Sequence, residues 1–93
     1  MKLTIRVYRQ FKRDIKLAKK RHLDMELLKT VIDALSEGKK LDESYRDHPL
    51  RGKYVGYREC HILPDWLLIY KVVEKELILV LARTGTHQDL FDE

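Results

Sequence analysis

The apolar positions of this 93-residue chain change their spacing along its length, and each spacing predicts a different element. Residues 3–8 alternate between apolar and polar side chains, which is typical of a strand with one buried face. In residues 9–21 the apolar side chains recur at intervals of four and then three residues from Phe11, which indicates an amphipathic helix. A second helix is predicted from Asp24, a good N-cap residue, to near Gly38, because a glycine commonly follows the last turn of a helix.

The second half of the chain predicts a sheet that follows a long loop. Residues 39–56 have no regular period, and loops of that length in a compact domain are usually functional or disordered. Three strands are then expected, joined by links so short that they favour antiparallel neighbours, at residues 57–62, 66–73 and 76–83. The tail, residues 84–93, has room only for a turn or a stub of helix.

The order of these elements predicts the fold class. A strand, two helices and a three-stranded antiparallel meander form an α+β domain, with both helices packed on one face of a twisted sheet. A chain of 93 residues needs nearly every segment in one core, so residues 1–93 are expected to form a single domain. The composition, 44% hydrophobic and 37% charged, is that of a globular protein.

The sequence does not predict a membrane protein or a secreted protein. Its apolar runs are all shorter than the roughly 20 residues that span a bilayer, and the first residues lack the apolar core of a signal peptide. A cytoplasmic location is therefore expected. Cys60 is the single cysteine, so it cannot form an internal disulfide and is expected to be a small core residue.

The charge is distributed unevenly. The net charge is +4, but residues 1–22 carry nine basic side chains against Asp14 alone, a local balance of +8, and the rest of the chain is therefore at about −4. Such asymmetry suggests that one face binds a polyanion such as a nucleic acid. The alternative is a solvated helix face with no partner.

Candidate chemistry lies in four short stretches, residues 47–50, 59–61, 64–66 and 83–87, and three of the four histidines fall in them. Histidine can take and give a proton near neutral pH. Cleavage of RNA without a metal needs a base to take the proton of the 2′-hydroxyl, an acid to protonate the departing 5′-oxygen, and cations to stabilise the phosphate. The side chains that could supply these parts are His48, His61, His87 and Arg83.

Each of these residues also has an ordinary structural interpretation. A histidine is often a hydrogen-bonded surface residue, and an aspartate after a proline, as at Asp65, is a natural turn residue. Trp66 opens an apolar strand, so it is either a core residue or a platform for an unpaired base. Phe91 could be a core residue, and Arg83 could form an ion pair.

The spacing of these stretches resembles one known family. Residues 47–52, 56–62, 64–71 and 83–87, followed by Leu90-Phe91, are similar to the YafQ branch of the RelE superfamily, and the similarity runs from end to end of the chain. The resemblance implies a RelE-like fold and a toxin of a type II toxin-antitoxin pair. Such a toxin is an endoribonuclease that cuts messenger RNA in the ribosomal A site without a metal or cofactor.

The resemblance also implies partners and residue roles. The partners would be the ribosome, messenger RNA and a cognate antitoxin, a small DNA-binding protein, in a heterotetramer or larger complex. The acid, base and charged positions of the family match His48, His61, Asp65 and His87, and its aromatic substrate-holding positions match Trp66 and Phe91. Arg83 is also expected to bind the substrate, as a cation beside the phosphate. His87 stands where the RelE branch proper has a cation. The side chains expected to dock on ribosomal RNA are Lys12, Arg13, Lys16, Lys19 and Lys20.

Three other functions fit parts of the same pattern. A nucleic-acid-binding module without catalysis would use the same basic helix and aromatic residues. A zinc enzyme could use the three histidines and Asp65, although their spacing is unlike that of familiar zinc motifs. A catalytically inactive partner protein would bind only an antitoxin-like peptide.

Overall fold

The computed structural model describes residues 2–92, which form one five-stranded sheet with strand order β1-β5-β4-β3-β2. The three central strands form an antiparallel meander, since β4 pairs with β3 on one side and with β5 on the other. The first strand pairs in parallel with β5, and a two-residue strand pairs with β3 at the other edge. The strands are β1 (Thr4–Val7), β2 (His48–Pro49), β3 (Arg58–Leu63), β4 (Trp66–Val73) and β5 (Ile78–Gly85).

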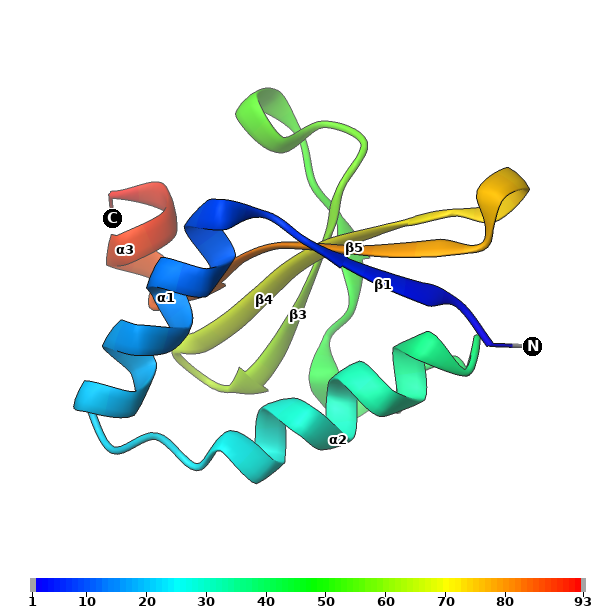
Figure 1. The fold of residues 1–93 in the computed structure, drawn as a ribbon. Coiled ribbons are helices and arrows are strands. Elements are labelled where there is room, and N and C mark those ends of the chain that lie inside the picture. The colour runs from blue at the N-terminus through cyan, green and yellow to red at the C-terminus, as the bar shows by residue number, and fades with distance from the viewer. Residues whose placement is uncertain (1, 93) are drawn as a thin grey trace.

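Helices α1 (Arg9–Lys20) and α2 (Met25–Ser36) cover one face of this sheet, with α1 to the left of the sheet and α2 below it in Figure 1. Their apolar stripes pack into one core with inward-facing residues of β3, β4 and β5. The Asp24 carboxylate accepts a hydrogen bond from the Glu26 backbone N–H at 3.0 Å, and so caps α2 as the sequence predicts.

The opposite face of the sheet has a smaller cover. The loop of residues 50–57, green in Figure 1, rises above the sheet. Its Tyr54 and Tyr57 pack against the cluster that includes Leu67 and Ile69 of β4. The short helix α3 (His87–Phe91) adds Leu90 and Phe91 to the same cluster. This thinner cover leaves polar side chains of the sheet accessible near α3.

The predicted α+β fold is confirmed, including the antiparallel meander and the position of both helices on one face. The last strand begins two residues later than predicted, because Glu74–Glu76 form a 3-10 turn and Leu77 takes a left-handed conformation with φ of 55°. Strand β2 lies inside the segment that was expected to be loop throughout. Among residues 2–92, no helix has the length and apolar character needed to cross a bilayer.

Candidate active site

A buried carboxylate on β3 joins two histidines. Glu59 and His61 are two residues apart on this strand, so their side chains lie on the same face, the one opposite α1 and α2. His48 of β2 is the cross-strand partner of Glu59. The Glu59 Oε1 atom lies 3.2 Å from the Nε2 atom of His48 and 3.2 Å from that of His61.

A third histidine continues this line. The ring of His61 lies 6.4 Å from the ring of His48 and 5.7 Å from that of His87, measured between centroids. His87 belongs to α3, and Asp65 in the turn between β3 and β4 holds it. One oxygen of Asp65 accepts hydrogen bonds from the His87 backbone N–H at 2.9 Å and from Nδ1 at 2.6 Å. These two bonds, the backbone one first, lower the pKa of Asp65. We call His48, His61 and His87 the histidine row.

Helix α3 is fixed at its first turn, which sets the position of His87. Thr86 caps the helix in a reciprocal pair of bonds with Asp89. Arg21 at the end of α1 binds the same Asp89 carboxylate at 2.6 Å and lowers its pKa to about 2. Gly85 leaves room for that carboxylate, because a Cβ atom there would lie 2.9 Å from Asp89 Oδ2.

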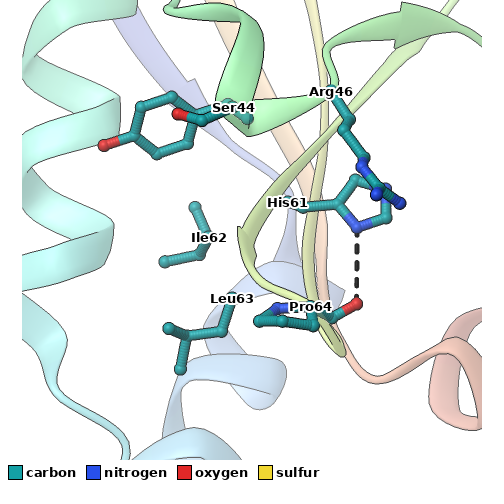
Figure 2. Close-up of a pocket in the computed structure, with 7 residues that line it drawn as sticks. Ser44, Arg46, His61, Ile62, Leu63 and Pro64 are labelled. Atoms are coloured by element: carbon teal, nitrogen blue, oxygen red, sulfur yellow. Dashed lines mark hydrogen bonds between the residues drawn. The ribbon is translucent and has the colours of Figure 1, made fainter.

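The three histidines differ in how their nitrogens are used. The Nδ1 atom of His48 lies 3.2 Å from the carbonyl oxygen of Pro49, and that of His61 lies 3.4 Å from the carbonyl oxygen of Pro64 (Figure 2). Both rings therefore sit between two acceptors, and each can donate to both only when it carries both protons. The Nε2 atom of His87 has no hydrogen-bond partner within residues 2–92.

The loop that carries His48 is anchored beneath the site. Asp47 accepts hydrogen bonds from Arg58 Nε at 2.9 Å and from the Tyr70 hydroxyl. Burial, followed by the bond to Asp47, raises the pKa of the Tyr70 phenol well above its usual range, so this group remains a donor. The anchor holds β2 against β3 although the two strands share only two residue pairs.

Trp66 is placed differently from the sequence prediction. Its side chain is 2% exposed, lies in the core beneath the helices, and donates from Nε1 to the Thr84 hydroxyl at 2.9 Å. An indole buried in this way offers no face to an unpaired base, so the substrate-binding interpretation of Trp66 is corrected to a core role. Cys60 is buried as predicted, and burial raises its pKa to about 12.

Arg83 and Phe91 are both in contact with other protein groups. The Arg83 guanidinium donates to Asp14 from Nε at 2.8 Å and from Nη2 at 3.1 Å, and its Nη1 atom lies 3.5 Å from the Tyr54 hydroxyl. Phe91 packs edge-on against Tyr54 with 5.8 Å between centroids. The sequence allowed an ion pair as one possible role of Arg83, and the structure contains this pair, with Asp14.

The basic side chains of α1 point away from the core. The five side chains expected to dock on RNA are all exposed: Lys12, Arg13, Lys16, Lys19 and Lys20. The apolar stripe of α1 lies on the other side of the helix, where Phe11 and Ala18 are 4% exposed. A continuous cationic surface is therefore available without disturbing the fold.

Glu59 is a site residue that the sequence interpretation did not assign. The signal was present, because Glu59 and His61 share one face of any strand that includes both. The link from Glu59 to His48 could not be found in the same way, since it depends on the two-residue strand β2. Together His48, Glu59 and His61 place three possible ligand atoms within 4.8 Å of one another, a set that could also hold a metal ion.

Comparison with known proteins agrees with the resemblance read from the sequence. Residues 3–92 match the family described as "Bacterial toxin of type II toxin-antitoxin system, YafQ". The "mRNA interferase toxin YafQ" of Escherichia coli K12 is 48% identical over 83 residues, which cover 88% of each chain.

Two solved structures are similar over almost their whole length. The toxin in the E. coli DinJ-YafQ toxin-antitoxin complex superposes with a TM-score of 0.88 at 43% identity, covering 98% of this chain and 99% of that one. A metal-bound toxin from Helicobacter pylori superposes with a TM-score of 0.89 at 40% identity, covering 96% of this chain and 99% of that one. The chain therefore belongs to the YafQ family of bacterial type II toxin-antitoxin toxins.

Proposed function

We propose that this protein is an endoribonuclease that cleaves messenger RNA on the ribosome through its histidine row. The observation that carries the proposal is the row itself, in which His87 is oriented by Asp65 while His48 and His61 share the buried Glu59. The E. coli relative is named an mRNA interferase, which supports the same activity here.

The geometry suggests a division of labour between the three rings. His87 holds its Nδ1 proton against Asp65, which leaves Nε2 to exchange a proton with the substrate. His48 and His61 each lie between a backbone carbonyl and the Glu59 carboxylate, which fixes both rings. Their proposed role is to donate hydrogen bonds to the phosphate oxygens as negative charge develops there.

The reaction proposed for the site needs no group beyond the RNA and these side chains. A base removes the proton of the 2′-hydroxyl, and the oxygen attacks the adjacent phosphorus. The bond from phosphorus to the 5′-oxygen breaks, and that oxygen takes up a proton. The products are a 2′,3′-cyclic phosphate and a 5′-hydroxyl. Asp65 contributes by fixing the orientation of the His87 ring.

Substrate contacts are also proposed for Phe91 and Arg83. Phe91 is partly buried against Tyr54, so one edge of this aromatic pair can pack against a base. Asp14 holds the Nε and Nη2 atoms of Arg83, so the proposed substrate contact of Arg83 is a hydrogen bond from the remaining nitrogen, Nη1, which lies 3.5 Å from the Tyr54 hydroxyl.

The ribosome and an antitoxin are the proposed partners, and the cytoplasm is the proposed location. The exposed basic face of α1 supports docking on ribosomal RNA, since polyanion binding is driven by contacts between cations and phosphates. The E. coli relative forms a complex with the antitoxin DinJ, which supports a cognate antitoxin for this protein.

The function is tested by comparing translated and free messenger RNA. We expect the purified protein to cut translated messenger quickly and naked RNA slowly, because the ribosome would supply much of the positioning of the reacting groups. Sequencing of the cleaved ends should reveal cyclic phosphates and 5′-hydroxyls. Rapid cleavage of free RNA at many sites would contradict the proposal.

A metal-dependent activity is the second candidate, because His48, Glu59 and His61 form a possible ligand set and the H. pylori relative is a metal-bound toxin. The residues fit a soft or borderline divalent ion, with two imidazoles and one carboxylate. If this candidate is correct, a chelator stops cleavage and added metal restores it. The metal-free mechanism predicts full activity in the chelator.

The docking role of α1 is tested by reversing its charge. Changing Lys12, Lys16 and Lys19 together to Glu should weaken ribosome association most at low salt, while the packing cost stays within about 0.5 kcal/mol per site because the side chains are exposed. Cosedimentation with ribosomes over a salt series measures the effect. Unchanged association at low salt would show that this face is only solvated.

A further inference from the structure

A hollow of about 450 Å³ opens beside His61 along the outer edge of β3 (Figure 2). Strand β2 pairs only with Arg58 and Glu59, so within residues 2–92 no strand covers that edge from His61 to Leu63. The turn at Glu43–Tyr45 and the following Arg46 form the other wall. The volume lies in the range of small-ligand sites, roughly 300 to 1,000 Å³.

The hollow has a polar wall and an apolar wall. Ser44, Arg46 and His61 provide the polar groups, and Figure 2 shows the Arg46 side chain extending towards the end where the His61 ring lies. On the other side lie the side chains of Leu63 and Pro64, and Leu63 is 41% exposed. A cationic group opposite an apolar surface matches the two parts of a nucleotide, its phosphate and its base.

The Arg46 guanidinium is available for an anion. Within residues 2–92 it forms no ion pair and no side-chain hydrogen bond. Acidic residues flank it, but the Asp47 carboxylate is bound by Arg58 and Tyr70, and the Asp42 carboxylate accepts from the Ser44 backbone N–H at 3.0 Å. These acids orient the loop and leave the arginine without a protein partner.

The backbone at Arg46 is also unusual. This residue has a left-handed conformation, with φ of 50° and ψ of 41°, and its N–H donates to the carbonyl oxygen of Glu43 at 3.0 Å. This conformation is energetically unfavourable for most residues that carry a Cβ atom, whereas glycine or asparagine adopts it at little cost. The same left-handed conformation occurs at His22, Leu77 and Asp92, each just past a helix or turn, so at Arg46 it sets the direction of the loop.

We propose that this hollow binds the nucleotide adjacent to the cleaved phosphate of single-stranded RNA, with Arg46 pairing with its backbone phosphate and its base packed on Leu63 and Pro64. His61 belongs both to the histidine row and to the hollow, so the two sites are contiguous. The inference rests on the proposed ribonuclease function and adds a positioning residue outside the histidine row.

Cleavage of ribosome-bound messenger by Arg46→Gln tests the proposal. Loss of one charge-assisted phosphate contact should lower kcat/KM about tenfold, and Arg46→Lys should retain part of the rate. The matched control is Arg51→Gln, which removes an exposed arginine of the same loop that does not line the hollow. Thermal unfolding of all variants checks that the fold is kept.

A neutral methylphosphonate placed at single linkages of the messenger identifies the partner of Arg46. At one linkage next to the cleaved one, the methylphosphonate should slow cleavage by the wild type about tenfold. The Arg46→Gln variant should cut this modified messenger as fast as it cuts the unmodified one, because it has already lost the contact. If Arg46→Gln cleaves as fast as Arg51→Gln, the inference is overturned.

Binding without cleavage separates the two proposals. A 2′-O-methyl dinucleotide cannot be cut, and titrating it into the wild type should shift the backbone amide NMR signals of Ser44, Arg46 and Leu63. The Arg46→Gln variant should show much smaller shifts. If the wild type fails to cut messenger but shows these shifts, the proposed function fails and the hollow stands as an RNA-binding site. If these signals do not shift in the wild type, the proposal that the hollow binds a nucleotide is wrong, even if the protein cleaves messenger RNA.

Discussion

Two buried carboxylates of this domain have opposite surroundings. Asp14 of α1, 8% exposed, accepts from the Arg83 guanidinium at two points and from the Thr84 backbone N–H and the Gln10 amide. Among residues 2–92, the charged or hydrogen-bonding side chains in contact with Glu59 of β3, which is 5% exposed, are two imidazoles. An arginine stays charged at any ordinary pH, whereas a histidine can lose its proton.

The difference separates a structural ion pair from a chemical site. The partners of Asp14 are permanent donors, so removing its charge leaves the half-buried Arg83 guanidinium without its charged acceptor. The partners of Glu59 can become neutral. Removing the Glu59 charge should therefore affect proton transfer in the reaction more than the free energy of unfolding. The pKa of Arg83 is raised, first by its bond to Asp14, which agrees with the structural role of that pair.

The largest expected effect is on catalysis. We predict that His87→Ala lowers messenger cleavage by about 10² to 10⁴ and abolishes growth inhibition, because proton transfer by one side chain is typically worth that much. The protein should stay folded, since His87 lies on a short exposed helix at the edge of the domain. Gln88→Ala, one residue along the same helix, is the control and should cleave normally. Near-wild-type cleavage by His87→Ala would move the acid-base role to His48 or His61.

Asp14→Asn tests the structural side of the comparison. We predict that the free energy of unfolding falls by about 2 kcal/mol, because the half-buried Arg83 guanidinium and the buried Thr84 N–H lose a charged acceptor. Urea unfolding followed by circular dichroism measures the loss. Asp33→Asn, which removes the carboxylate of the exposed pair with Lys29, should leave the unfolding midpoint nearly unchanged. Equal effects of the two substitutions would show that burial of Asp14 does not matter.

Glu59→Gln tests the chemical side. We predict a loss of cleavage of about tenfold and a changed pH profile, because two imidazoles lose their shared charged acceptor. The loss of unfolding free energy should be clearly smaller than for Asp14→Asn, since the histidines can release their protons. A destabilisation as large as that of Asp14→Asn, with an unchanged pH profile in the folded fraction, would refute the distinction.

Asp89→Asn gives the smallest and most pH-dependent effect. The folded pKa of Asp89, about 2, is below its usual value of 3.8, so the bond with Arg21 stabilises the fold above pH 4 and is lost as the pH falls towards 2. We predict that the variant is about 1 kcal/mol less stable at pH 7, and that this difference shrinks as the pH is lowered to 3 and below. Asp92→Asn, at the end of the same helix, is the control. A difference that does not change with pH would contradict the proposed ion pair.

The sequence by itself determined the elements and most of the chemical groups. Apolar spacing placed two helices and four strands, because burial of one face imposes a period of 3.6 on a helix and of two on a strand. The histidines were found because imidazole can take and give a proton near neutral pH, and Asp65 was found because the spacing of its motif resembles that of the YafQ branch. The same local periods predict which side chains of α1 and α2 are buried in the core and which basic side chains of α1 are exposed.

Tertiary structure decided which of these groups meet. The two-residue strand β2 carries too few residues to have a period, and it forms because Asp47 is anchored by Arg58 and Tyr70. The parallel pairing of β1 with β5 joins residues more than 70 positions apart, which local patterns do not encode. Burial of Trp66, the pairing of Arg83 with Asp14, and the role of Glu59 all depend on such distant contacts, since a side chain's partners are set by the packing of elements and not by its neighbours in the chain.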